Sequence, residues 1–126
     1  MKGFVAGENI EEAMLVSLID GKVYKATSGA NVIGVTDYSV KTGKVVDVIL
    51  SGIGEIQVEG SAVAGDAVVL KENGKAQAFS LDLFADTTVD TVVNIVGILL
   101  DGDSTGAYLP ANITNTVVVV PKQKTE

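Results

Sequence analysis

An internal repeat constrains the fold of this chain more than any other feature of its sequence. Residues 31–35 (NVIGV) return as residues 94–98 (NIVGI), and the dipeptide at 42–43 (TG) returns at 105–106 with the same spacing. Each copy combines a short apolar run, a polar connection and a glycine-containing turn, a pattern that indicates β-strands joined by turns. The sequence therefore predicts two copies of one β unit.

The repeat extends toward the N-terminus through two hairpin signals. Asp20-Gly21 and Asn73-Gly74 each lie between two strand-like runs, and both dipeptides tolerate the positive φ angles of a type I′ turn. The spacing between these turns is shorter than the spacing of the motifs that follow them. We therefore expect an insertion in the second copy at residues 80–93, which is helical or irregular, although its many Thr and Val residues fit a strand equally.

These signals predict a single all-β domain over residues 1–126, a small compact β-barrel or sandwich built from the two related units. The units cover about residues 14–50 and 67–111, with an N-terminal arm at 1–6 and a polar tail at 121–126. At most one short helix is expected, and residues 9–12 (NIEE) resemble an N-cap that suffices for a single helical turn. The valine run at 117–120 must be paired or covered, because an open strand of this kind would aggregate.

The charge balance limits the partners that this protein can bind. Its 126 residues include 16 acidic residues and 9 lysines, which give a formal net charge of −7, and arginine is absent. Surfaces that grip phosphates carry clustered Arg and Lys, so we expect neither nucleic acid nor a membrane surface as a partner. No segment resembles a transmembrane helix or a signal peptide, and we expect synthesis and folding in the cytoplasm.

The composition also argues against an enzyme. The chain has no histidine and no cysteine, which excludes Ser/His/Asp and Cys/His arrangements and thiolate metal sites. Most acidic residues, such as Asp20 and Asp66, occupy turn positions, where they solvate backbone. Residues 101–106 (DGDSTG) resemble the opening of a calcium loop, but the twelfth position, where Glu is required, is Asn112. We expect a polar turn there, no metal and no cofactor.

The order of the motifs adds a family resemblance. GKV after the first hairpin turn, then VIGV, TGKVVDVIL, GIGEIQV, AGDAV and IVGIL, follow one another between about residues 7 and 109. In this order and spacing the chain resembles the capsid decoration (cement) and head-fibre proteins of tailed bacteriophages. It departs from their most regular pattern in the insertion at 80–93 and at Pro110, which is expected to interrupt the strand corresponding to residues 44–50.

The resemblance implies a non-enzymatic virion structural protein on the exterior of a phage head. Such a protein binds the major capsid protein lattice, often as a homotrimer, and stabilises the head. Candidate capsid contacts are Lys2, Phe4 and Val5 in the N-terminal arm, because a short terminal segment can become ordered on a partner. The alternative, that Phe4 packs on its own domain, stays open.

Two other classes of protein share parts of this pattern. One is a domain of a viral fibre or a host-surface adhesin, which would bind glycans or cells. The other is a biotinyl or lipoyl carrier domain, in which a lysine at a hairpin tip carries the cofactor. Lys22 and Lys75 follow the two turns here, but the flanking residues of such modification sites are missing.

Overall fold

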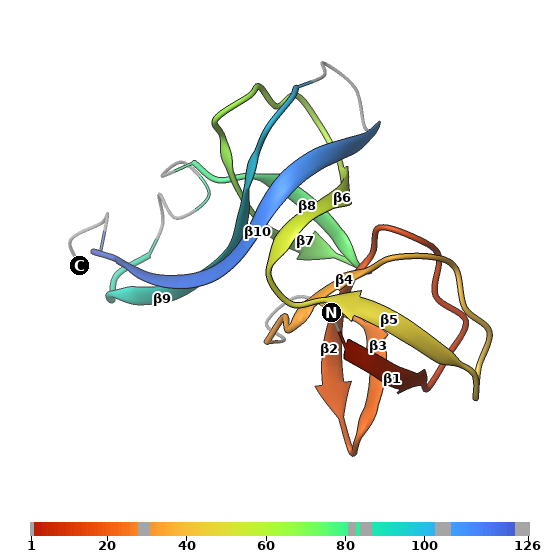
Figure 1. Cartoon of the computed structure of the whole chain (residues 1–126). Coiled ribbons are helices and arrows are strands. Elements are labelled where there is room, and N and C mark those ends of the chain that lie inside the picture. Colours follow the sequence, from red (N-terminus) through yellow and green to blue (C-terminus); the bar gives the residue numbers. More distant parts are fainter. Residues whose placement is uncertain (1, 28–30, 81–82, 84–86, 103–106, 123–126) are drawn as a thin grey trace.

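The chain forms ten β-strands in a computed structural model, which describes residues 2–27, 31–80, 83, 87–102 and 107–122 (Figure 1). No α-helix occurs among these residues, and thus none that could cross a membrane. The predicted all-β class is confirmed. The strands are β1 (Lys2–Ala6), β2 (Leu15–Ile19), β3 (Lys22–Lys25), β4 (Gly34–Thr36), β5 (Val45–Ile49), β6 (Gly52–Val58), β7 (Ala67–Glu72), β8 (Lys75–Ala78), β9 (Thr91–Leu99) and β10 (Ala107–Val120).

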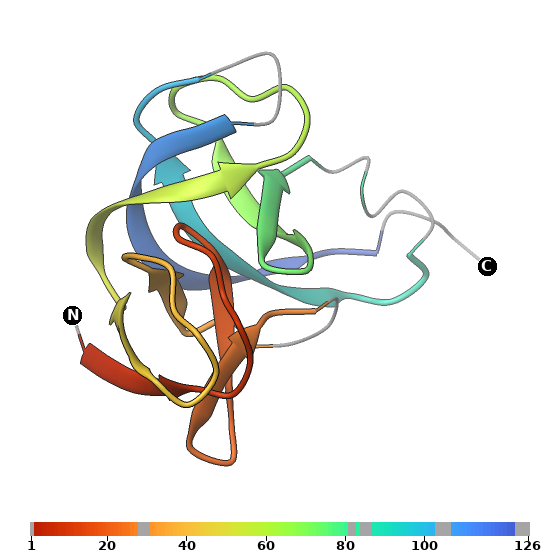
Figure 2. The ribbon, with the colours of Figure 1, turned by 90° about the vertical axis from the view of Figure 1, so that its right-hand side faces the viewer.

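The strands close into two small barrels with the same connectivity. The first barrel has the order β1-β3-β2-β4-β5, and the second has β6-β8-β7-β9-β10, with β10 returning to β6. Each barrel includes one parallel pair, β1 with β3 and β6 with β8. The first barrel therefore begins with β1 and the second with β6, each one strand before the hairpin at which the sequence repeat begins. Figures 1 and 2 show the two barrels side by side.

Both hairpin turns have the backbone that their dipeptides predict. The φ angles are 51° and 80° at Asp20 and Gly21, and 51° and 78° at Asn73 and Gly74. Positive φ at both central positions defines the type I′ turn, whose twist matches that of the flanking strands. The two hairpins differ because β7 shifts its register between Leu70 and Glu72, a bulge with no counterpart in β2.

The first barrel docks on the second by burying one of its outer faces. Its own interior holds Val16, Val23, Val46 and Val48, all fully buried. Residues from its β2, β4 and β5 and from the connection between β3 and β4 turn outward and join the core of the second barrel. Burying a Leu, Val or Ile side chain contributes about 1.5–3 kcal/mol, so this contact stabilises both barrels. The outward-turned residues are Leu15, Ala26, Val32, Val35 and Ile49.

The tip of the second hairpin completes this junction. Gly74 accepts a hydrogen bond from the Leu15 backbone N–H (2.7 Å) and donates one to the Ala26 carbonyl (2.8 Å). A Cβ atom at Gly74 would lie 2.6 Å from Met14 Sδ and 3.2 Å from the Leu15 carbonyl oxygen. At Gly21, the corresponding position in the first hairpin, a Cβ atom would meet nothing within 4 Å. The same turn is thus docked in one copy and free in the other.

Two asparagines tie the end of the second copy to the first barrel. Asn115 Nδ2 donates to the Ile33 carbonyl (2.8 Å) and the Leu50 carbonyl (3.4 Å), and Asn94 Nδ2 donates to the Val32 carbonyl (3.4 Å). Asn115 has a φ of 48°, a conformation that asparagine tolerates better than most residues. Asn115 is therefore held in place both by its tolerance of positive φ and by the hydrogen bonds of its side chain.

Four sequence predictions need correction or restriction. Residues 2–6 are not a free arm but strand β1, paired with β5 and β3. Residues 9–12 form no helical turn; Ile10 instead makes a bridge with Val40. Pro110 does not interrupt β10, because it pairs with Glu55 of β6 while its own backbone nitrogen faces the β9 side, just beyond the last β9–β10 pair, where no ladder hydrogen bond needs an N–H. The insertion at 80–93 is only partly described, and its last residues, from Thr91, belong to β9.

The two hairpin glycines should differ in their effect on stability. Gly21→Ala should lower the free energy of unfolding by about 1 kcal/mol, the penalty of an L-residue at positive φ. Gly74→Ala adds a clash with the first barrel and should cost about 3 kcal/mol. Urea titration of both variants measures the difference. Equal losses would show that the second hairpin tip is not packed at the junction.

Substitutions of Asn115 should separate its backbone preference from its hydrogen bonds. Asn115→Ala loses the bonds and strains the positive φ, and should cost about 2 kcal/mol of unfolding free energy. Asn115→Gly also loses the bonds but accepts the φ angle, and should cost about 1 kcal/mol less than the alanine variant. Thermal unfolding of the pair measures this. An unchanged midpoint in both would mean that Asn115 does not hold the barrels together.

Candidate functional site

The three candidate contact residues of the N-terminal segment divide between the two faces of β1. Lys2 and Phe4 lie opposite Val48 and Val46 of β5, which are fully buried, so these two side chains are on the interior side of the sheet. Val5 alternates with them and is on the outer side, with 36% of its surface exposed. The structure therefore does not bring Lys2, Phe4 and Val5 together as one surface.

Phe4 and Lys2 sit at the rim of the first barrel. Phe4 is half-buried and packs against the barrel interior, as the alternative reading of this segment held. The Lys2 ammonium lies 5.3 Å from the centre of the Phe4 ring, within range of a cation–π contact. The two side chains cover this end of the barrel, and of the two only Lys2 is well exposed.

Val5 belongs to a row of side chains that crosses the outer face of the first barrel. It lies opposite Val45 on β5 and opposite Lys22 on β3, and Lys22 lies opposite Ile19 on β2. Directly opposed residues share a face of a sheet. Val45 and Ile19 are 58% and 52% exposed, so the row presents three apolar side chains with one lysine among them. We call Ile19, Lys22, Val5 and Val45 the outer row.

The charge distribution differs between the first barrel, which carries the outer row, and the second barrel. Five of the nine lysines precede Gly52, whereas ten of the sixteen acidic residues follow it. The first barrel is thus close to electrically balanced, and the second copy carries most of the negative charge. An acidic partner surface would be repelled less by the first barrel than by the second.

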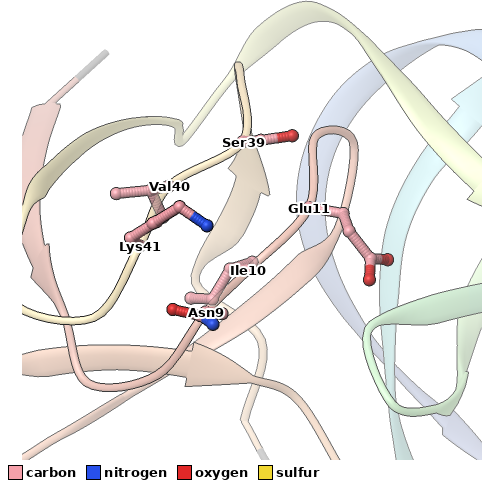
Figure 3. Close-up of a pocket in the computed structure, with 6 residues that line it drawn as sticks. All are labelled: Asn9, Ile10, Glu11, Ser39, Val40 and Lys41. Carbon is pink, nitrogen blue, oxygen red and sulfur yellow. The ribbon is translucent and has the colours of Figure 1, made fainter.

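A shallow depression of about 300 Å³ opens beside the first barrel, lined by Asn9, Ile10, Glu11, Ser39, Val40 and Lys41 (Figure 3). Its polar groups hold the loops together: Asn9 Oδ1 accepts hydrogen bonds from the Thr42 N–H (2.9 Å) and hydroxyl (3.2 Å). Figure 3 shows Lys41 reaching toward Ile10 while the Glu11 carboxylate points away. The depression therefore has no paired acid and base for catalysis.

The acidic turn residues act as the sequence predicted. Asp66 Oδ2 accepts a hydrogen bond from the Val63 N–H (3.0 Å), and Asp101 Oδ1 accepts one from the Gly102 N–H (2.9 Å). No group of three His, Cys, Asp or Glu side chains that could hold a metal occurs within the part of the chain that the structure describes. The rest of the calcium-like segment, residues 103–106, lies outside the described residues.

One ion cluster lies on the second barrel. Glu59 pairs with Lys71 (3.0 Å) and Lys75 (3.3 Å), and the hydrogen bond from Lys71 is the main cause that holds the pKa of Glu59 below its usual value. A lowered pKa stabilises the fold above the unfolded pKa, and the effect is lost as pH falls; for so exposed a group it is small. Lys75, one of the two candidate carrier lysines, is thus in an ion pair, and Lys22 lies in the outer row.

The sequence analysis named one member of the outer row, Val5, as a contact candidate, and did not name Ile19, Lys22 or Val45 as contacts. These residues come together only because the barrel closes through a parallel β1–β3 pair, which no turn motif announces. Alternation alone would have marked Val45 as an outward residue, but five of the six residues from Val45 to Leu50 are apolar, which obscures the alternation.

The fold has relatives among solved structures. The N base of head fiber gp8.5 of bacteriophage phi29 matches 93% of this chain and 95% of its own, with a TM-score of 0.67 and 14% identity. The C-terminal fragment of gene product 12 of bacteriophage phi29 matches 89% of this chain and 98% of its own, with a TM-score of 0.56 and 13% identity. No protein-family model and no curated protein matches the sequence.

These comparisons define the fold class: this chain has the fold of a phage head-fiber base. The resemblance to phage head proteins, inferred from the order of short motifs, is confirmed at the level of the fold. At 13–14% identity the match concerns the backbone arrangement alone.

Calcium should have no effect on stability. The segment that begins at Asp101 lacks the bidentate glutamate of a calcium loop, so it should bind the ion too weakly to shift unfolding. We expect the same melting temperature in millimolar calcium and in chelator, measured by circular dichroism. A rise of several degrees with calcium would contradict this and make Asp101 and Asp103 candidate ligands.

Proposed function

We propose that this protein is a non-enzymatic structural component of a phage virion that binds the outer surface of the head and stabilises it. Its partner is the lattice of the major capsid protein, and it acts as a homo-oligomer, a trimer in the simplest case. The observation that carries the proposal is the match of nearly the whole chain to nearly the whole base of a phage head fiber.

The outer row is the surface that we assign to the head. It places Val5, one of the three arm candidates, beside Val45 and Ile19 in an apolar strip with a single lysine. Covering a half-exposed valine contributes about 1 kcal/mol, so one copy alone would bind weakly. Several copies linked in an oligomer bind the lattice together, and their modest contacts combine into tight retention.

A second candidate function keeps the same fold. A domain of a viral fibre or of a host-surface adhesin would also be a non-enzymatic β module, and the relative in phi29 is itself part of a head fiber. The two functions differ in the partner: the fibre or adhesin reading requires binding to glycans or cells. A carrier domain is less well supported, because Lys75 is engaged with Glu59. Native mass spectrometry would reveal an attached cofactor.

The binding proposal is tested with expanded phage heads that lack this protein. Purified protein should co-sediment with the heads and raise the temperature at which they release DNA or disassemble. Val45→Lys places a charge in the outer row and should weaken binding at least tenfold, because it removes apolar contact and leaves a desolvated ammonium. Val63→Lys is the matched control: Val63 is 63% exposed on the connection before β7, and its replacement should leave binding unchanged.

Two results would count against this assignment. No binding of the wild-type protein to mature heads of the cognate phage would exclude the decoration function. Equal binding by the Val45→Lys and Val63→Lys variants would be consistent with head binding but would show that the outer row is not the contact surface.

A further inference from the structure

β9 and β10 continue beyond the second barrel as a two-stranded ribbon. Residues 91–95 of β9 and 116–120 of β10 pair with each other, while β6 pairs with β10 only as far as Ile113 and β7 pairs with β9 only at Gly97 and Ile98. Of the described strands, none pairs with the outer edges of these ten residues. Figures 1 and 2 both show this ribbon running out from the barrel toward the C-terminus.

The two faces of the ribbon have different environments. On the inner face Val93, Ile95 and Val120 are buried and pack with Val69 of the second barrel. On the outer face Val92, Val117 and Val119 are 69%, 61% and 61% exposed, and Val92 lies directly opposite Val119. We call these three residues the valine face. The valine run at 117–120 was predicted to be paired or covered. It is paired with β9, but only its inner face is covered within the chain.

Nothing in the ribbon protects it from association. None of its ten residues is charged, although soluble proteins commonly place lysine or proline on open strand edges to prevent pairing. The first proline and lysine come only afterwards, at Pro121 and Lys122. Three exposed valines on a strand pair with open edges form a surface that another chain can cover.

The charge of the molecule favours a second copy of this chain as the partner of the valine face. With a net charge of −7, two copies of this chain repel one another over most of their surfaces, and least where a surface is uncharged. The valine face is such a surface, and it is also self-complementary, because an apolar patch on a symmetry axis meets its own copy. A basic or acidic partner would find no opposite charge within the ribbon.

The first copy supplies an internal comparison. Gly52 and Asn115 lie at the same distance in sequence beyond Gly34 and Gly97, and both have positive φ, at 101° and 48°. Gly52 begins β6, which enters the second barrel, where Ile56 and Val58 are buried in its core. The corresponding segment after Asn115 is the end of β10, residues 116–120, where Val117 and Val119 are exposed.

We propose that the valine face is the self-association surface of this protein, where the ribbons of neighbouring copies pack together. The inference rests on the proposed function only in taking the protein to be a homo-oligomer, and it adds the surface by which the copies meet. Equivalent ribbons brought together around a symmetry axis bury Val92, Val117 and Val119 of each copy and remove their strand edges from solvent.

Light scattering coupled to size exclusion tests this without any phage heads. The wild-type protein should have a mass two or three times that of the chain at micromolar concentration, and Val119→Lys should be a monomer. Ile53→Lys is the matched control, since Ile53 is 73% exposed on β6, away from the ribbon, and its replacement should keep the wild-type mass. Circular dichroism confirms that each variant is folded.

If the lysine variant fails to fold, Val119→Thr decides, because it keeps the shape of valine and its preference for strands while making the surface polar. It should raise the concentration at which half of the protein is associated at least tenfold. A monomeric wild type, or lysine and threonine variants that associate as the wild type does, would overturn the inference.

Head binding is measured separately, so the two proposals can fail independently. An oligomer that depends on Val119 but does not bind heads would sustain the self-association surface and reject the capsid-binding function. A monomeric wild type whose head binding is abolished by Val119→Lys would show that the ribbon faces the head, which overturns self-association.

Discussion

The docking of one barrel on the other is the interaction on which the rest of this structure depends. Leu15, Val35 and Ile49 point away from the interior of the first barrel, and in an isolated barrel they would be exposed to water. The second barrel buries them, and Gly74 supplies two backbone hydrogen bonds at the junction. Small barrels bury little surface by themselves, so joining two of them adds a shared core to the interior that the first barrel has of its own.

This junction makes two equivalent copies unequal. The hairpin tip at Gly74 is buried, whereas the tip at Gly21 is free. The face of the first barrel that meets the second is covered by a partner barrel, whereas the corresponding side of the second is closed by its own ribbon. Among the exposed apolar side chains are those of the outer row on the first barrel and those of the valine face on the ribbon. The outer row and the valine face lie on different repeat units of the chain. Binding to a head and association with other protein molecules therefore need not compete.

Local backbone chemistry made part of the fold predictable. Asp20-Gly21 and Asn73-Gly74 specify their turns through φ angles that few other dipeptides accept, and the sequence identified both. β1 was missed because its partners, β3 and β5, lie far along the chain and no turn motif links it to them. Pro110 was misread because the cost of a proline depends on whether a neighbouring strand needs its N–H, which only the β9 ladder reveals. The outer row depends on barrel closure and has no local signal.

Cross-linking mass spectrometry of the protein bound to phage heads tests the central claim, that the first barrel faces the capsid, most directly. Lys22 lies in the outer row and Lys44 directly precedes Val45, whereas Lys71 and Lys75 lie on the second barrel beside Glu59. An amine-reactive cross-linker of short span should join Lys22 and Lys44 to the major capsid protein and leave Lys71 and Lys75 without capsid links. Capsid links confined to Lys71 and Lys75 would contradict the account.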